Sequence, residues 1–226
     1  MKEEVLLGLS RRQLEAALRP LRQGMMSADS VLIFKDPSTG IPFASTADEL
    51  KEWTFMTAMH QPRYAAPAAV LSNNFYVFGG YNTPRIGEIA VVRSAERYDL
   101  KSESWTKLPS LPFTCSGGSS ISLKDSIVLC GGGEINGQRT CFRFWPSQQK
   151  WTQISPMNVG RMYFSLVNFS DRVCAMGGTG KISLGDLSYS DYWWTSVECY
   201  HLKSDNWTLS QSLLLPRLLS SAVWTG

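Results

Sequence analysis

The chain has 226 residues, of which 43% are hydrophobic and 18% are charged, and its formal net charge is +3. This composition supports a folded core and excludes an intrinsically disordered protein. The sequence contains no block of like charges, so it gives no indication of nucleic-acid or membrane-surface binding.

The N-terminal 28 residues are predicted to be a helical extension. Apolar residues recur at helical spacing between residues 3 and 23, arginines occupy the other face, and Pro20 should bend or end the helix. This helix could bind a partner or end a preceding helical domain. It could equally cap the domain that follows or reflect where the chain was cut. We assign it no chemistry.

Three later stretches share a fixed order of landmarks. In each, a short apolar run stops at a glycine pair, and an aromatic residue follows that stands seven residues before a tryptophan. The run suits a strand buried on both faces, and the glycines allow a sharp turn and close backbone approach. The landmarks are Gly79-Gly80, Tyr98 and Trp105; Gly131-Gly132, Phe144 and Trp151; and Gly177-Gly178, Tyr200 and Trp207.

These repeats of about 50 residues resemble the kelch motif, whose unit is one four-stranded blade of a β-propeller. The resemblance implies an all-β, kelch-type β-propeller over residues 29–226. We expect a degenerate blade at 31–55, where Lys35-Asp36 replaces the glycines and Thr46 replaces the aromatic residue before Trp53. Three better preserved blades should follow at 63–107, 113–153 and 161–209, with a partial blade strand at 217–224.

The number of blades has two interpretations. Residues 31–55 could supply the second to fourth strands of a blade and residues 217–224 its first strand. Kelch propellers often close in this way, and the ring would then have four blades. Alternatively, the chain is a fragment of the six-bladed ring that is more common in the family. Both interpretations stay open.

Loops carry the binding sites of propellers, since the strands form the scaffold. The loops after the glycine pairs, and those leading into each first strand, should gather on one face around the central channel. Aromatic and arginine side chains there are candidates for protein binding. From these loops we select Tyr81, Arg85, Arg139, Tyr192 and Trp193. Alternatively, Trp193 and Trp194 start the next strand and pack between blades.

An arginine stands ten residues after three of the four repeat tryptophans (Trp53, Trp105, Trp151 and Trp207): Arg63, Arg161 and Arg217. These resemble the family's basic residues at the start of the innermost strand, where they can pair with acidic groups of a peptide. Alternatively, each arginine bonds loop carbonyls and is structural. The fourth such position is Cys115, which is either a reactive thiol or an inert buried one.

The cysteines give no motif. Their number is odd and no C-x-x-C spacing occurs, which fits neither a disulfide framework nor a zinc site. We expect reduced thiols packed in the core of a cytoplasmic protein. No apolar run approaches the roughly 18 residues of a membrane span, and the acidic start lacks the positive flank of a secretory signal. The cysteines are Cys115, Cys130, Cys141, Cys174 and Cys199.

Catalysis finds little support. Only two histidines occur, His60 and His201, and no nucleophile elbow, zinc-protease motif or Walker loop is present. We predict no catalytic residue, no metal site and no cofactor. An active site assembled from distant loops is the alternative, and a converging acid and histidine pair would favour it.

The resulting prediction is a protein-interaction module that binds a partner peptide or acidic loop. The resemblance implies a substrate receptor of a cullin-type ubiquitin ligase, preceded by BTB and BACK domains. No BTB-like segment fits in the thirty residues before the first blade, so we expect this chain alone neither to dimerise through one nor to recruit a ligase. The alternatives are an actin-binding scaffold and, with less support, a propeller enzyme.

Overall fold

The computed structural model describes residues 31–35, 42–46, 56–82, 90–133, 139–169, 171–183, 189–219 and 222. Within them the chain forms strands, turns and loops, without a helix. The all-β prediction is therefore confirmed. The predicted N-terminal helix of residues 1–28 lies outside the described residues.

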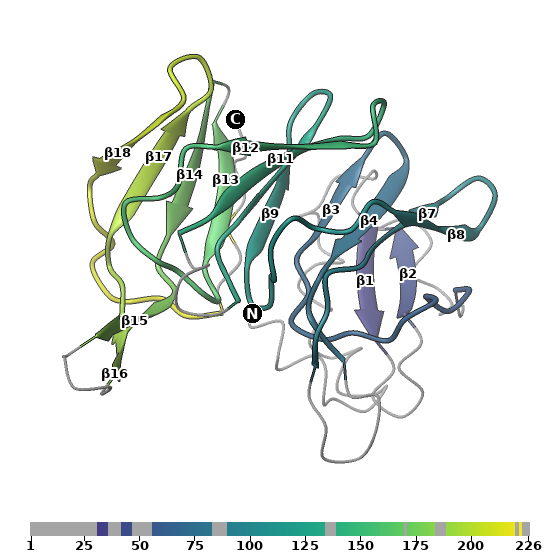
Figure 1. Ribbon diagram of the computed structural model, residues 1–226, viewed down its shortest axis with the longest axis horizontal. Coiled ribbons are helices and arrows are strands. Elements are labelled where there is room, and N and C mark those ends of the chain that lie inside the picture. Colours follow the sequence, from purple (N-terminus) through teal and green to yellow (C-terminus); the bar gives the residue numbers. More distant parts are fainter. Residues whose placement is uncertain are drawn as a thin grey trace.

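Three sheets of four antiparallel strands follow one another along the chain and stand side by side in the same order (Figure 1). We call them blades A, B and C. Blade A consists of β3 (Ala68–Leu71), β4 (Asn74–Phe78), β7 (Ala95–Asp99) and β8 (Ser104–Leu108). Blade B consists of β9 (Ser119–Ser122), β10 (Ile127–Cys130), β11 (Cys141–Trp145) and β12 (Lys150–Ile154). Blade C consists of β13 (Ser165–Phe169), β14 (Arg172–Met176), β17 (Val197–His201) and β18 (Asn206–Ser210).

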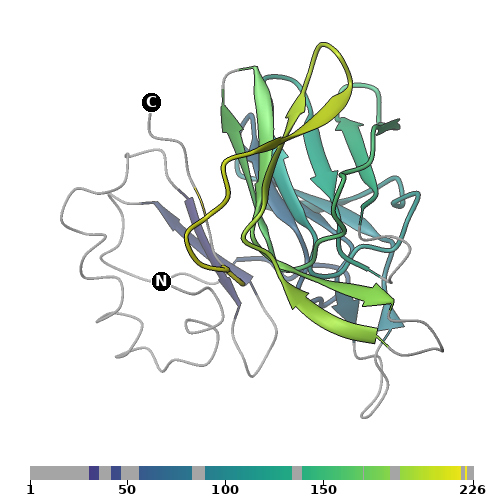
Figure 2. The same cartoon turned by 90° about the vertical axis from the view of Figure 1, so that its left-hand side faces the viewer.

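Three two-stranded sheets lie outside the blades. The hairpin β5 (Tyr81–Asn82) and β6 (Ala90–Val91) extends blade A, and β15 (Thr179–Ser183) and β16 (Tyr189–Trp193) extend blade C. β1 (Val31–Lys35) pairs only with β2 (Pro42–Thr46) among the described strands. Figure 2 shows this pair to one side of the three blades. Of the predicted strand 217–224, the described residues 217–219 and 222 are not in a strand.

The aromatic residue and the tryptophan of each repeat are opposite each other on the third and fourth strands. Their ring centroids are 5.1 Å apart for Tyr98 and Trp105 and 5.4 Å apart for Tyr200 and Trp207. In blade B the Phe144 and Trp151 centroids are 4.7 Å apart. The constant spacing of seven residues is thus the register of one antiparallel hairpin.

Large side chains fill the spaces between the blades. Between A and B, Tyr76 and Phe78 of β4 pack against Phe144 of β11. Between B and C, Val128 and Cys130 share a core with Tyr200 and Trp207 of the next blade, among others. Blades B and C therefore each bury their tryptophan face against the blade before them, as expected for sheets that cannot bury both faces alone.

The glycine pairs join neighbouring blades. The second glycine donates its N–H to a carbonyl of the segment that follows its own blade: Gly80 to Cys115 (2.6 Å), Gly132 to Arg161 (2.9 Å) and Gly178 to Arg217 (2.6 Å). Gly131 has a φ of +67°, and a Cβ there would lie 2.6 Å from the Arg161 carbonyl oxygen. Only glycine allows this backbone conformation and this approach together.

The prediction of reduced thiols is wrong for four of the five cysteines. Cys130 is bonded to Cys141, its register partner on β11, and Cys174 is bonded to Cys199, its register partner on β17. Pairing between adjacent strands brought together cysteines that show no motif in the sequence. Reduced thiols therefore do not support a cytoplasmic location, which stays a prediction.

Candidate functional site

Two of the predicted arginines are buried inside their own blades. Arg63 is 3% exposed and donates to the Gly79 and Ser94 carbonyl oxygens, both at 2.8 Å, and to the Glu96 carboxylate at 2.6 Å. Arg161 is fully buried and bonds the Gly177 carbonyl (2.7 Å), the Ser196 carbonyl (3.0 Å) and the Glu198 carboxylate (3.1 Å). These are the contacts of the structural alternative, and neither side chain faces solvent.

Each carboxylate also accepts two backbone N–H groups. Glu96 accepts from His60 (2.8 Å) and Gln61 (3.2 Å), and Glu198 accepts from Asn158 (2.7 Å) and Val159 (3.2 Å). We call each arrangement of arginine, glutamate and two N–H groups a carboxylate knot. Burial alone would raise the pKa of Glu96, but the hydrogen bonds from Arg63 and His60 outweigh it and hold the pKa below its ordinary value.

The knots were missed in the sequence although a signal was present. A glutamate stands nine residues before Trp105 and Trp207, in the two blades whose first strand starts from an arginine. In blade B both partners are absent: Cys115 replaces the arginine and Phe142 the glutamate. Phe142 stacks on Phe113 with centroids 5.3 Å apart. The arginine and the glutamate are thus lost together, as a structural pair would be.

Of the two alternatives for Cys115, a reactive thiol or an inert buried one, the structure agrees with the inert thiol. It is fully buried and donates to the Gly131 carbonyl oxygen at 3.3 Å. Burial raises its pKa to about 12, so the thiolate is essentially absent at neutral pH.

His60 and Glu96 are the only described acid and histidine pair at bonding distance, with His60 Nδ1 2.8 Å from Glu96 Oε2. Such a pair was the observation that would favour an enzyme. Here the carboxylate already accepts from Arg63 and from backbone N–H groups, and blade C has Asn158 at the position of the histidine. Within the described residues, no group of three or more His, Cys, Asp or Glu residues could hold a metal ion.

The three remaining arginines that were predicted as site residues do not form one site among the described residues. Arg139 is exposed, and its Nε donates to the Met157 carbonyl at 2.6 Å while the Met157 N–H donates back to Arg139. Arg85 lies outside the described residues. Arg217 is exposed, and its backbone carbonyl accepts from Gly178.

Predicted aromatic residues lie where the glycine pairs lead out of the blades. Tyr81 stacks on Tyr64 with centroids 5.3 Å apart. On the β15–β16 hairpin, Tyr192 is 51% and Trp193 62% exposed, whereas Trp194 donates its indole N–H to the Gly160 carbonyl. The backbone bridges Tyr64–Tyr81 and Met162–Thr179 are equivalent, so both groups belong to the same loop face. Trp193 therefore does not pack between blades.

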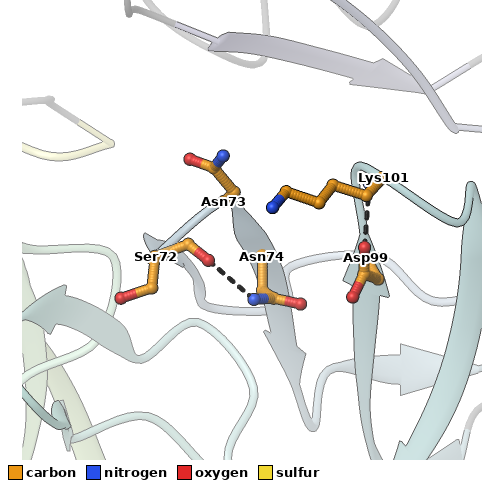
Figure 3. Close-up of a pocket in the computed structure, with 5 residues that line it drawn as sticks. All are labelled: Ser72, Asn73, Asn74, Asp99 and Lys101. Carbon is orange, nitrogen blue, oxygen red and sulfur yellow. Dashed lines mark hydrogen bonds between the residues drawn. The ribbon is translucent and has the colours of Figure 1, made fainter.

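A polar hollow of about 360 Å³ lies at the opposite end of blade A (Figure 3). It is formed by the β3–β4 and β7–β8 turns. Asn74 donates to the Ser72 carbonyl at 2.7 Å, and Asp99 accepts the Lys101 N–H at 2.8 Å. The backbone N–H groups of Lys101 and Ser102 lower the pKa of Asp99. The hydrogen bonds shown shape the two turns themselves.

Comparisons with known proteins agree with this geometry. The model of the kelch motif family matches residues 62–112. Beta-scruin of Limulus polyphemus is 28% identical over 176 residues, 76% of this chain and 19% of that protein. Kelch-like protein 36 of Bos taurus is 26% identical over 182 residues, 78% of this chain and 28% of that protein. The chain thus spans less than a third of either relative.

The solved structure of YjhT has the same fold. It superimposes with a TM-score of 0.57 at 16% sequence identity, covering 82% of each chain. No helix among the described residues is both long and apolar enough to cross a membrane. The chain thus carries a kelch motif at residues 62–112 and is similar to kelch-repeat proteins, and its four-stranded blades with their glycine pairs and aromatic–tryptophan hairpins have a β-propeller fold.

Proposed function

We propose that this propeller binds another protein through its loop face and that the β15–β16 hairpin makes the main contact. The observation that carries the proposal is the exposure of Tyr192 and Trp193 on a hairpin that projects from blade C at the lower edge of Figure 1. The tryptophans of the three blades, in contrast, are largely covered by their neighbours. Exposed tyrosine and tryptophan side chains of this kind are enriched among the residues that dominate binding energy.

The tyrosines of blade A extend the same face. Tyr64 is 41% exposed and lies against Tyr81, so the loop face offers a second aromatic surface in addition to the hairpin. Arg63 and Arg161 are not part of the proposed surface, because their guanidinium groups are used inside the blades.

Two partner classes follow from the kelch resemblance. The first is a substrate peptide or acidic loop, with this propeller as the substrate-reading part of a cullin-type ubiquitin ligase adaptor. The match to Kelch-like protein 36 over 78% of this chain supports this class. The second is an actin filament, with the propeller as a cytoskeletal scaffold. Both classes would use the loop face.

The test compares Trp193→Ala and Tyr192→Ala with Leu209→Ala, which removes an equally exposed apolar side chain from the outer strand β18. Chemical cross-linking in cell extract would identify partners of the wild-type chain, and each would be purified and titrated. Purified filamentous actin would be tested in parallel by cosedimentation. We expect Trp193→Ala to raise the Kd at least about tenfold, and Leu209→Ala to leave it unchanged.

Melting temperatures would be measured for all variants. The two aromatic variants should stay within a few degrees of the wild type, because the substituted side chains are exposed. A partner that binds the Trp193→Ala and Tyr192→Ala variants as tightly as the wild type would rule out the hairpin as the binding surface.

A further inference from the structure

Two exposed arginines occupy equivalent positions on the loop face. Arg93 and Arg139 each stand two residues before the third strand of their blade, which is β7 in blade A and β11 in blade B. The next residues, Ser94 and Thr140, accept the N–H group of the first glycine of each pair. Both arginines therefore lie at the end of the blade where the glycine pairs lead out, which is the loop face.

The same two hydrogen bonds orient each arginine. The Leu111 N–H donates to the Arg93 carbonyl at 2.7 Å, and Arg93 Nε donates to the Leu111 carbonyl at 2.7 Å. In blade B, the Met157 N–H donates to the Arg139 carbonyl at 2.9 Å, and Arg139 Nε donates to the Met157 carbonyl at 2.6 Å. Leu111 and Met157 are fully buried. Each guanidinium group is thus anchored to a fixed part of the segment that leads into the next blade.

The free end of each guanidinium group suits a carboxylate. Apart from the bond made by Nε, neither Arg93 nor Arg139 forms a side-chain hydrogen bond or an ion pair with a described residue. The two Nη groups lie side by side in the guanidinium plane and match the two oxygens of a carboxylate. Because Nε already fixes this plane, binding costs less side-chain freedom than it does for an unanchored arginine.

Blade C has a different surface at the same end. Thr195 stands at the position of the two arginines, and its carbonyl accepts the Leu213 N–H at 2.8 Å. The β15–β16 hairpin of this blade instead exposes Tyr192 and Trp193. The blades stand side by side in the order A, B, C (Figure 1). The loop face thus has anchored cations on blades A and B and the aromatic hairpin on blade C.

We propose that Arg93 and Arg139 bind two carboxylates of the partner, whose apolar part lies on the β15–β16 hairpin. This inference rests on the proposed function and specifies its partner as a protein segment with acidic residues next to apolar ones. The acidic residues lie over blades A and B and the apolar residues over blade C. The separation of the two surfaces therefore fixes the orientation of the partner on the loop face.

A signal for Arg93 was present in the sequence, although only Arg139 was selected there. An arginine stands twelve residues before Trp105 and before Trp151, since 105 − 93 and 151 − 139 both give 12. The bond from Nε to the following segment gives this spacing its meaning. Without that bond, Arg93 is one of several arginines in a long loop.

The first test uses fluorescein-labelled hexaglutamate as the probe and labelled hexaglutamine as its uncharged control. Fluorescence anisotropy at about 50 mM NaCl would give the Kd of both for the wild-type chain. Hexaglutamate should bind and hexaglutamine should not, and about 500 mM NaCl should weaken the binding of hexaglutamate because exposed charges are screened by salt. Equal binding of both probes, or no binding of hexaglutamate up to about 1 mM, would overturn the proposal.

The double variant R93Q/R139Q removes both guanidinium groups. Its control, R172Q/K203Q, removes the same charge from two exposed side chains at the opposite end of blade C. We expect R93Q/R139Q to raise the Kd of hexaglutamate at least about fivefold and the control to raise it less than about twofold. An unchanged Kd in R93Q/R139Q, or an equal rise in both variants, would mean that the probe follows net charge alone and would overturn the proposal.

R93K/R139K separates the guanidinium fork from its charge. Lysine keeps the charge but cannot contact both carboxylate oxygens in this geometry, so the Kd should rise by about two- to threefold. A Kd equal to that of the wild type would contradict the two-oxygen contact. Circular dichroism would verify that the variants fold, and the comparison of hexaglutamate with hexaglutamine needs no variant.

Trp193→Ala separates this inference from the proposed function. The substitution should leave the Kd of hexaglutamate unchanged, because this probe has no apolar part, and should weaken only the binding of a complete protein partner. Loss of the arginine effect with an intact hairpin effect would overturn the carboxylate contacts alone. The reverse result would overturn the role of the hairpin and leave the two arginines as the binding site.

Discussion

Blades A and C differ from blade B at the point where the first strand begins, although the three backbones follow the same path. In A and C a buried arginine and glutamate hold the strand ends, and in B Cys115 and the stacked pair Phe113 and Phe142 occupy this place. The same backbone geometry at the start of the first strand is thus filled by polar side chains in blades A and C and by apolar side chains in blade B. Since the chain accommodates both, the element common to the three blades is the glycine pair, whose second N–H bonds a carbonyl of the segment that follows; we call this contact the glycine clamp. The carboxylate knot, in contrast, is not required in every blade.

The clamp should therefore be the most sensitive point. Gly131→Val places a branched side chain at a φ of +67° and within 2.6 Å of the Arg161 carbonyl oxygen and 2.7 Å of Phe164. We expect a loss of more than about 4 kcal/mol in the free energy of unfolding, the largest effect of any substitution considered. Circular dichroism and chemical denaturation would measure it.

Thr106→Val on the exposed outer strand β8 is the control, and its effect should stay within about 0.5 kcal/mol. A folded Gly131→Val protein of near wild-type stability would show that the glycine pair does not act as a steric clamp. The comparison of the blades would then need another common element.

The second largest effect should come from breaking one knot. Arg161→Met leaves the Glu198 carboxylate buried without its cation and should cost about 3–5 kcal/mol in the free energy of unfolding. The triple variant R161C/E198F/V159F places the apolar residues of blade B, which are Cys115, Phe142 and Phe113, at the corresponding positions of blade C. Because it leaves no buried charge, we expect it to cost less than about 2 kcal/mol.

Urea denaturation of both variants would compare them. A triple variant that is less stable than Arg161→Met would mean that the apolar residues of blade B cannot replace the ion pair in blade C, because the surroundings of blade C require the charged groups. The single variant also separates structure from function, since partner binding should change only in proportion to the unfolded fraction.

Much of the fold was accessible from the sequence because the repeat fixes both register and turn chemistry. The spacing of seven between Tyr98 and Trp105 predicted a pair of successive strands, and the glycine pair predicted close backbone contact. The role of Arg63 and Arg161 could not be decided in this way, since an arginine at a strand start can point into the channel or into its own blade. The position of Glu96 and Glu198 decides it, and this requires knowing the strand register.

The disulfide pairs also could not be predicted without knowing the strand register. Cys130 and Cys141 are separated by 11 residues and Cys174 and Cys199 by 25, so no common spacing marks them. Both pairs are register partners on the second and third strands of a blade, and their separations differ because the loop between these strands differs in length from blade to blade. Tyr192 and Trp193, in contrast, were selected from the sequence because aromatic residues gathered in a loop segment that the repeat did not explain. Both are exposed, and their role in binding stays a prediction.

The smallest effect should be the pH dependence of the knot in blade A. Hydrogen bonds from Arg63 and His60 hold the pKa of Glu96 below its ordinary value near 4.5, so the folded state binds the proton less readily than the unfolded state. Such a carboxylate stabilises the fold above about pH 4.5, and the stabilisation is lost as the pH falls through the lower, folded-state pKa. The melting temperatures of the wild type and Glu96→Gln would be compared at pH 7, 5, 4 and 3. The wild type should be the more stable at pH 7 and 5, and its advantage should shrink from pH 4 to pH 3. An advantage that stays constant over this range would mean that the charge of Glu96 does not stabilise the fold. The knot of blade A would then differ from the apolar residues of blade B only in how its side chains fill the space.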